Sequence, residues 1–156
     1  MQLLTLLALL CLLGSTLSKG ALSRRCRKPE ENARSTCPNG KENTLRFTYD
    51  RNSKKCHQYW QSGCDRRRRN NINSFDDFTE CMRECNPTSK CLQTPKKHRW
   101  FPLFTTYVFN RTTMKCEEKK SFRKPDIGDE YNRFKKEKDC KSTCEPTLQI
   151  IITNSG

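Results

Sequence analysis

The sequence predicts a small, disulfide-rich α+β protein made of two similar units, each a twisted β-hairpin followed by a C-terminal helix. Three observations predict this class. Of the 11 cysteines, all but Cys11 lie in two groups that both end in Cys-x3-Cys. An even, clustered set of this kind is typical of disulfides in an oxidising compartment. Only 33% of the residues are hydrophobic, so we expect two stapled units rather than one large core.

The first element is an apolar N-terminal segment, residues 1–18, which predicts a secretory signal peptide. Its apolar run, residues 3–13, is too short to span a bilayer comfortably, and small polar residues follow it. Cleavage after Ser18 fits the pattern best, a cut near Gly20 is an alternative, and a retained membrane anchor is less favoured. We therefore expect a secreted, extracellular protein with an N-terminal arm at residues 19–25.

Each unit is predicted to begin with a hairpin. The segments 45–56 and 104–116 are strand-like and end at a cysteine, and each places two aromatic residues two positions apart, on one strand face. These pairs are Phe47/Tyr49 and Tyr107/Phe109.

A helix is predicted to close each unit, because cysteines at i and i+4 share one helix face. The pairs are Cys81/Cys85 and Cys140/Cys144. Asp77 is a suitable N-cap for the first helix, with Glu80 three residues on in the manner of a capping box. The first unit then spans 26–85, a short linker spans 86–90, the second unit spans 91–144, and a tail spans 145–156.

With these cysteines the first unit reads C-x10-C-x18-C-x7-C-x16-C-x3-C and resembles a Kunitz (bovine pancreatic trypsin inhibitor-like) domain. Both units also carry an Asn-x-Phe motif five residues before the fifth cysteine of the pattern, at 73–75 and 132–134. The family's bonding scheme implies Cys26–Cys85, Cys37–Cys64 and Cys56–Cys81. The second unit lacks the second and fourth cysteines, and the resemblance implies Cys91–Cys144 and Cys116–Cys140.

The resemblance also implies where a protease would be bound. Extra residues fall in three segments that meet at one end of the Kunitz fold, around the substrate-like loop. In the family the residue after the second cysteine enters the protease's specificity pocket, and here it is Pro38, which cannot reach a carboxylate deep in such a pocket. Arg34 or Lys41 could take the role, and Phe101 could do so in the second unit. The candidate reactive-loop residues are Arg34, Cys37, Pro38, Asn39, Lys41, Arg99, Trp100, Phe101 and Pro102.

The basic residues form a second candidate surface. The net charge is +14, and four arginines follow Cys64 directly: Arg66, Arg67, Arg68 and Arg69. They form either a solvated loop or a contact patch for heparin-like glycans, anionic phospholipid or an acidic exosite. Secretion excludes nucleic acid as the expected partner.

Catalysis and cofactors are not expected. Neither His57 nor His98 has a nucleophile pattern near it, and zinc-type cysteine pairs are absent, so we predict no enzyme activity, no metal and no cofactor. Asn110 lies in an acceptable N-glycosylation sequon at the predicted hairpin turn. The tail carries three isoleucines at 150–152, which could dock on the second unit or on a partner, or be disordered.

The two-unit organisation resembles secreted tandem-Kunitz proteins of tick saliva, a group with anticoagulant members. The resemblance implies a monomeric serine protease inhibitor that binds a coagulation factor or its zymogen, with factor Xa or factor VIIa/tissue factor as the expected targets and with exosite contacts. The alternative is a non-inhibitory binding module for glycosaminoglycan, a receptor or an ion channel.

Overall fold

The computed structural model describes residues 22–29, 41–61, 63, 72–95, 103–121 and 124–149. Two hairpin-plus-helix units follow each other along the chain, and the predicted fold class is confirmed. The first unit contains the 3-10 helix η1 (Arg25–Arg27), strands β1 (Thr44–Asp50) and β2 (Lys55–Gln61), and helix α2 (Phe78–Cys85). The second contains η3 (Lys90–Leu92), β3 (Phe104–Asn110), β4 (Lys115–Ser121) and α3 (Glu137–Cys144), and strand β5 (Leu148–Gln149) follows. The predicted signal peptide lies outside the described residues.

The two hairpins share one turn design. Asp50 ends β1, and its carboxylate accepts hydrogen bonds from the next backbone N–H groups, at 2.7 and 3.0 Å. The side-chain oxygen of Asn110 does the same after β3, at 2.9 and 3.4 Å. Each turn ends on a residue with φ 54°, Lys54 in the first hairpin and Met114 in the second. Short polar side chains that accept from the backbone ahead of them are typical turn starters, so the turn follows directly from the sequence.

The asparagine of each Asn-x-Phe motif ties the pre-helix loop to the hairpin. Asn73 accepts from the backbone N–H of Tyr49 at 2.8 Å and donates to its carbonyl at 2.7 Å. Asn132 makes the same pair of bonds with Phe109, at 3.0 and 2.7 Å. Both asparagines are buried, and each occupies the place of a missing strand neighbour. The motif is therefore a structural device, because the amide satisfies backbone groups that the core would otherwise leave unpaired.

The phenylalanine of the motif carries a cation on its ring. The guanidinium of Arg25 lies 3.8 Å from the ring centroid of Phe75. In the second unit the ammonium of Lys90 lies 4.6 Å from the centroid of Phe134. Both cations come from the residue just before the first cysteine of their unit. A cation over an aromatic face is attractive, so the start of each unit is held against its pre-helix loop.

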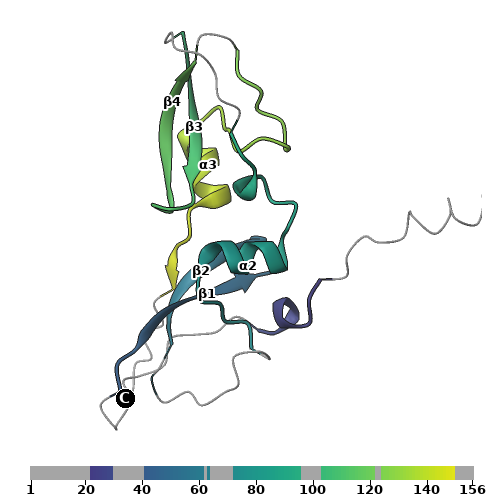
Figure 1. Cartoon of the computed structure of the whole chain (residues 1–156), viewed down its shortest axis with the longest axis vertical. Coiled ribbons are helices and arrows are strands. Elements are labelled where there is room, and N and C mark those ends of the chain that lie inside the picture. The colour runs from purple at the N-terminus through teal and green to yellow at the C-terminus, as the bar shows by residue number, and fades with distance from the viewer. Residues whose placement is uncertain are drawn as a thin grey trace, which may run out of the picture.

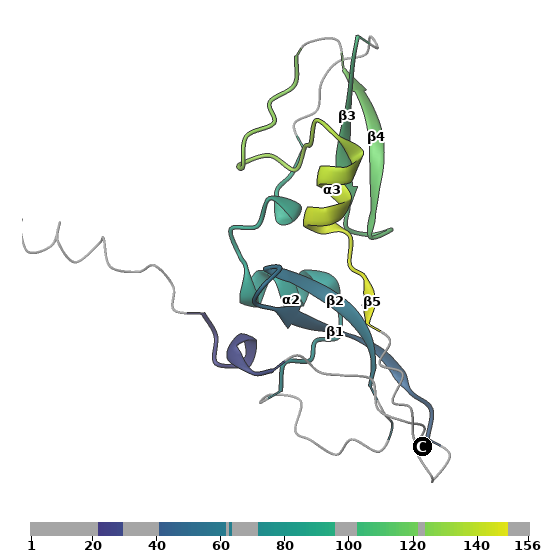
Figure 2. The ribbon, with the colours of Figure 1, turned by 180° about the vertical axis from the view of Figure 1, so that it is seen from behind.

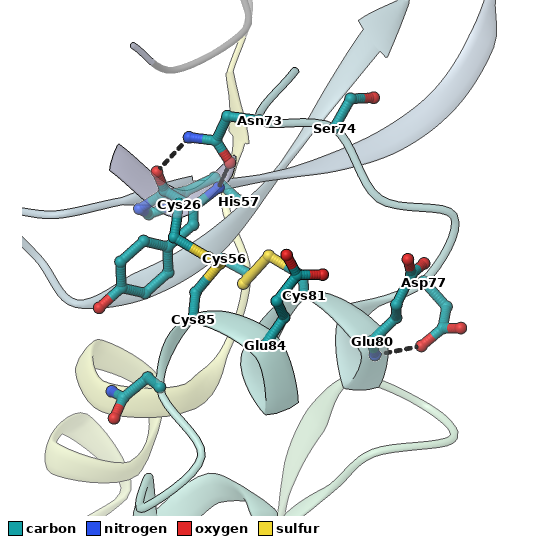
Figure 3. Close-up of a disulfide and its surroundings, with 12 residues drawn as sticks. Cys26, Cys56, His57, Asn73, Ser74, Asp77, Glu80, Cys81, Glu84 and Cys85 are labelled. Atoms are coloured by element: carbon teal, nitrogen blue, oxygen red, sulfur yellow. Dashed lines mark hydrogen bonds between the residues drawn. A yellow bond between two sulfur atoms is a disulfide. The ribbon is translucent and has the colours of Figure 1, made fainter. Parts of the chain in front are cut away.

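The two helices differ at their N-termini. Asp77 caps α2 by accepting from the N–H of Glu80 at 2.8 Å (Figure 3). The carboxylate of Glu80 reaches back, as the predicted capping box requires, but it accepts from Asp76 at 3.0 Å rather than from the N-cap itself. The α3 N-cap is Lys136, whose side chain makes no capping bond. The N-terminus of α2 is therefore better capped than that of α3.

Disulfides fasten each helix to its hairpin and to the start of its unit. The described bonds are Cys26–Cys85, Cys56–Cys81, Cys91–Cys144 and Cys116–Cys140, four of the five pairs that the resemblance implies. Cys37 and Cys64, the members of the fifth pair, lie outside the described residues.

The tail joins the two units. After α3 the chain returns to the first unit, where β5 pairs in parallel with β2 and makes the sheet order β1-β2-β5 (Figures 1 and 2). The ring of Phe78 on α2 lies 5.2 Å from the ring of Phe109 on β3, and both belong to one continuous buried core. The sequence placed Leu148 and Gln149 in a tail beyond the second unit, and their docking on the first unit was not anticipated.

The strand directions place the open ends of the two hairpins far apart. In each hairpin the open end is where the first strand begins and the second strand ends. The open end of β1–β2 and that of β3–β4 point to opposite ends of the long axis of the molecule (Figures 1 and 2). The two turns and the two helices lie between them. Any surface formed at one open end is thus separated from the other by the whole core.

Candidate functional site

At the open end of the first hairpin, a glycine allows two segments of the chain to approach each other closely. A Cβ on Gly63 would lie 2.6 Å from the Cβ of Lys41 and 2.7 Å from the carbonyl oxygen of Glu42. Real side chains do not tolerate such contacts, so only glycine lets the chain after β2 pass this close to the chain before β1. Lys41, one of the predicted reactive-loop residues, is exposed here. The structure therefore places one candidate cation at the expected end of the unit.

Two partly exposed apolar side chains accompany it. Leu45 is 38% exposed and Trp60 is 41% exposed, and the two are register partners across β1 and β2. Alternation along the strands places them on the same face as Phe47, which is buried in the core. Sequence reasoning did not single out this pair. Counting two positions outward from Phe47 would have found Leu45, since the apolar row continues past the core.

The open end of the second hairpin is also apolar. Leu103 is 67% exposed and Phe104 is 41% exposed, and the backbone N–H of Leu103 donates to the carbonyl of Ser121 at 3.2 Å. These residues directly follow the predicted reactive loop of the second unit. Each open end therefore presents apolar side chains next to a segment that was predicted to bind.

Most of the predicted site residues lie outside the described part of the chain. They are Arg34, Cys37, Pro38, Asn39, Arg66, Arg67, Arg68, Arg69, Arg99, Trp100, Phe101 and Pro102. The chain that leads to them is described on both sides, at Pro29 and Lys41 in the first unit and at Pro95 and Leu103 in the second.

The junction of the units contains a histidine and a lysine that are both buried. The Nδ1 of His57 lies 2.7 Å from the hydroxyl of Thr147, and its Nε2 lies 3.0 Å from the hydroxyl of Ser53. The ammonium of Lys55 donates to the carbonyl of Ser142 at 3.1 Å. Burial lowers the pKa of His57, Lys55 lowers this pKa further, and Asp50 opposes the change. These polar groups fix the approach of the second unit, and a histidine held between two hydroxyl groups supports a structural role rather than a catalytic one.

Asn110, the predicted glycosylation site, is part of the second turn. Its Nδ2 donates to Glu117 at 2.5 Å while its oxygen caps the turn. Glu117 also accepts from Lys119 at 2.9 Å, and these hydrogen bonds, led by that of Lys119, lower the pKa of its carboxyl group. A glycan on Nδ2 would leave the oxygen and one N–H available, so the modification is compatible with the turn.

Within the described ranges, no cluster of three or more His, Cys, Asp or Glu side chains is arranged to hold a metal ion. The same part of the chain contains no helix with the length and apolar character that a membrane span requires.

The sequence is similar to a known domain family and to several known proteins. The Kunitz/Bovine pancreatic trypsin inhibitor domain profile matches residues 25–86. Haemaphysalin from Haemaphysalis longicornis is 30% identical over 130 residues, which cover 81% of this chain and 75% of that protein. The protease inhibitors of Actinia tenebrosa are 29% identical over 91% of this chain, which spans about half (48%) of their length.

A solved structure of ixolaris, determined by NMR in a study of its interaction with factor X, is 22% identical. It covers 76% of this chain and 92% of its own, with a TM-score of 0.29. The membership of this chain in a family is supported by the profile match, by the relationship to haemaphysalin and by the hairpin-plus-helix units with their disulfides. The chain belongs to the Kunitz/bovine pancreatic trypsin inhibitor family, whose members inhibit proteases and are not enzymes.

Proposed function

We propose that this protein is a secreted anticoagulant that inhibits a serine protease of blood coagulation, factor Xa or factor VIIa with tissue factor, largely through contacts outside the active site. The observation that carries the proposal is the described framework of the first unit. Its hairpin, its helix and its described disulfides are in place, Gly63 fits against Lys41, and the family profile covers residues 25–86. Such a framework holds Lys41 and Gly63 in place at this end, and a preorganised surface lowers the cost of ordering on association.

The exosite component follows from Pro38. Proline has no N–H group and a fixed φ, so it does not place a basic group deep in a trypsin-like pocket. The loops around it are extended relative to the family pattern, and Arg66 to Arg69 lie on one of them. An enlarged, strongly basic end suits an acidic surface of a coagulation factor better than it suits a narrow pocket.

The test compares a large and a small substrate. The folded mature protein, residues 19–156, is assayed against factor VIIa/tissue factor and factor Xa, with factor X or prothrombin as the protein substrate and short chromogenic peptides as the small one. We expect turnover of the protein substrate to fall strongly while peptide hydrolysis changes little. Equal and tight inhibition of both would place a loop in the active site, and single serine variants of Arg34, Lys41 and Phe101 would identify it. No effect on either substrate would refute the proposal.

The second candidate is a binding module without inhibitory activity, for glycosaminoglycan, a receptor or an ion channel. The net charge of +14 favours it, as does the absence of two framework cysteines from the second unit. Replacing Arg66 to Arg69 with serine separates the two functions. If the patch serves only glycan, heparin retention is lost and the effect on the protease is unchanged. Loss of both would mean that the same arginines contact the protease.

A further inference from the structure

A hollow in the surface of the first unit lies at the turn end of its hairpin. It has a volume of about 580 Å³, and two segments far apart in the sequence line it. Residues 27–29, at the end of η1, form one side, and residues 49–52, at the end of β1, form the other. Three cationic side chains meet there, those of Arg27, Lys28 and Arg51.

The charges of these three cations are not neutralised within the described part of the chain. All three side chains are exposed, and none of them makes an ion pair with another described residue. By contrast, Arg25 of the same 3-10 helix pairs with Glu80 and Glu84, at 3.2 and 3.4 Å. The carboxylate that lines the hollow, Asp50, accepts two N–H groups of the turn, and its side chain is only 15% exposed. The hollow is therefore positively charged.

A tyrosine hydroxyl completes the lining. Tyr49 is 5% exposed, and its hydroxyl has no hydrogen-bond partner among the described residues. The hydroxyl is not an enclosed atom, so it reaches solvent in the hollow that Tyr49 lines. Burial raises the pKa of Tyr49, Asp50 raises it further and Arg51 opposes the change, so the hydroxyl keeps its proton at neutral pH. Buried donors in native proteins normally have an acceptor, so this one indicates an acceptor from outside the chain.

The backbone on both sides of the hollow is held in place. The disulfide Cys26–Cys85 anchors η1 to helix α2. The backbone N–H of Lys28 donates to the carbonyl of Arg25 at 3.2 Å, and the carbonyl of Lys28 accepts from Asn73 at 3.3 Å. On the other side the turn is fixed by its hydrogen bonds to Asp50. A site whose backbone is fixed in advance loses less entropy when a ligand binds.

The chemistry of the lining suits a sulfate group on a glycan better than a membrane surface. A sulfate group offers only acceptor oxygens, which match the forked donors of arginine and the hydroxyl of tyrosine. A membrane-binding surface combines cations with apolar side chains that enter the bilayer. None of the exposed large apolar side chains of the described residues lines the hollow; they are Leu45, Trp60, Leu103, Phe104, Ile127 and Leu148.

We propose that the hollow between η1 and the first turn binds a sulfate group of a heparin-like glycan, with Arg27, Lys28 and Arg51 as cationic contacts and Tyr49 as a hydrogen-bond donor. This site goes beyond the proposed function, because it uses neither the predicted reactive loops nor the arginines at 66–69. Strand β1 has seven residues, so at about 3.3 Å per residue the site lies about 20 Å from the open end of the hairpin. A glycan here and a partner at the open end can therefore be bound at the same time.

The experiment uses the mature chain with Arg66 to Arg69 replaced by serine, so that this basic run does not contribute. Isothermal titration calorimetry measures the binding of a heparin hexasaccharide. Arg27→Ser/Arg51→Ser is expected to weaken binding by about tenfold or more, because two charge-assisted contacts are lost. Lys135→Ser/Lys138→Ser removes the same charge from exposed positions of the second unit. It is the matched control, with an expected change of about twofold or less, since distant exposed charges are screened by salt.

Tyr49→Phe tests the hydroxyl alone, because it leaves the net charge and the buried ring unchanged. We expect hexasaccharide binding to weaken by about threefold, the effect of one lost hydrogen bond, while the thermal unfolding midpoint stays the same. In NMR titrations, the hexasaccharide should shift the amide signals of residues 24–28 and 50–52. The amide signals of Lys41 and Leu45, at the open end, should not move.

Equal weakening by the two double variants would overturn the proposal, because the net charge alone would then attract the glycan. Unchanged binding in Tyr49→Phe, or amide shifts concentrated at Lys41 and Leu45, would place the glycan elsewhere. Binding to vesicles of phosphatidylcholine and phosphatidylserine in equal parts is the further arm. If the vesicles bind and Arg27→Ser/Arg51→Ser abolishes that binding, the hollow belongs to a membrane surface and the proposal is wrong. No protease is used in any arm, so the outcome is independent of the proposed function.

Discussion

Each unit has one buried arginine at the same place in its fold. The arginine comes from the first strand in one unit and from the pre-helix loop in the other. In the first unit Arg46 on β1 donates through Nε to the hydroxyl of Ser74 at 3.2 Å. In the second unit Arg133 in the pre-helix loop donates through Nη1 to the hydroxyl of Thr106 on β3 at 2.9 Å. Their exposed fractions are 3% and 5%. A buried guanidinium requires hydrogen bonds. In each unit a hydroxyl residue therefore stands on the segment that does not carry the arginine, Ser74 in the first unit and Thr106 in the second.

The buried motif asparagine gives a prediction about stability. Asn73→Ala leaves the N–H and the carbonyl of Tyr49 without their side-chain partner in a buried place. We expect the free energy of unfolding to fall by about 2–4 kcal/mol, because each buried unpaired group costs about 1–3 kcal/mol. Urea denaturation with the disulfides intact measures the loss. Asn52→Ala, at an exposed turn position, is the control and is expected to stay within about 0.5 kcal/mol of the parent.

His57 predicts a dependence on pH. Burial and Lys55 lower its pKa in the folded chain, so that between about pH 6.5 and the folded pKa the unfolded chain binds a proton that the folded chain does not. The contribution of the neutral ring is fully present above about pH 6.5 and is lost as the pH falls toward the folded pKa. We expect the urea midpoint to decrease between about pH 7.5 and about pH 5.5. His57→Gln should reduce that slope, and an unchanged slope would mean that His57 is not its source.

At the scale of the element, the uncapped N-terminus of α3 is a place where stability can be added. Lys136 occupies its N-cap with an extended backbone conformation and no capping bond. Lys136→Ser supplies a hydroxyl that can accept from Asp139, and a good N-cap contributes about 0.5–2 kcal/mol. The converse change, Asp77→Ala on α2, removes a bond of 2.8 Å and should destabilise by a similar amount. Thermal unfolding of both variants checks the pair, and a loss of stability in Lys136→Ser would contradict it.

The hairpins and helices could be predicted because each has its own local signal. Aromatic residues at i and i+2 mark the strands, Asp50 and Asn110 start the turns, and the paired cysteines mark one helix face. The disulfide pairs required the resemblance to a family, since spacing alone permits many connectivities.

Strand β5, the third strand of the first sheet, could not be predicted. β5 has only two residues, Leu148 and Gln149, and its conformation depends on the edge of β2, far away in the sequence. Of the predicted site, the described part of the chain contains Lys41 and Asn110, and the apolar pair Leu45 and Trp60 was missed. The sequence of a strand does not show how much of its face a helix covers. The exposure of Trp60 therefore depends on tertiary structure and could not be predicted locally.

The whole molecule is expected to unfold as one body although its sequence is a repeat. Phe78 and Phe109 join the two cores, β5 adds a strand from the end of one unit to the sheet of the other, and the hydrogen bonds of His57 and Lys55 cross the junction. Interactions of this kind couple neighbouring units, and a coupled pair unfolds in one cooperative transition.

Calorimetry tests this coupling. We expect the parent protein to show a single transition with equal calorimetric and van 't Hoff enthalpies, as a two-state unit does. Gln149→Pro removes an N–H from β5, and proline is poorly tolerated within a ladder, so the transition should broaden or divide into two. Gln149→Ala keeps the N–H and is the matched control. Two separate transitions in the parent would mean that the units are independent, and the opposed open ends would then be free to turn toward a common partner.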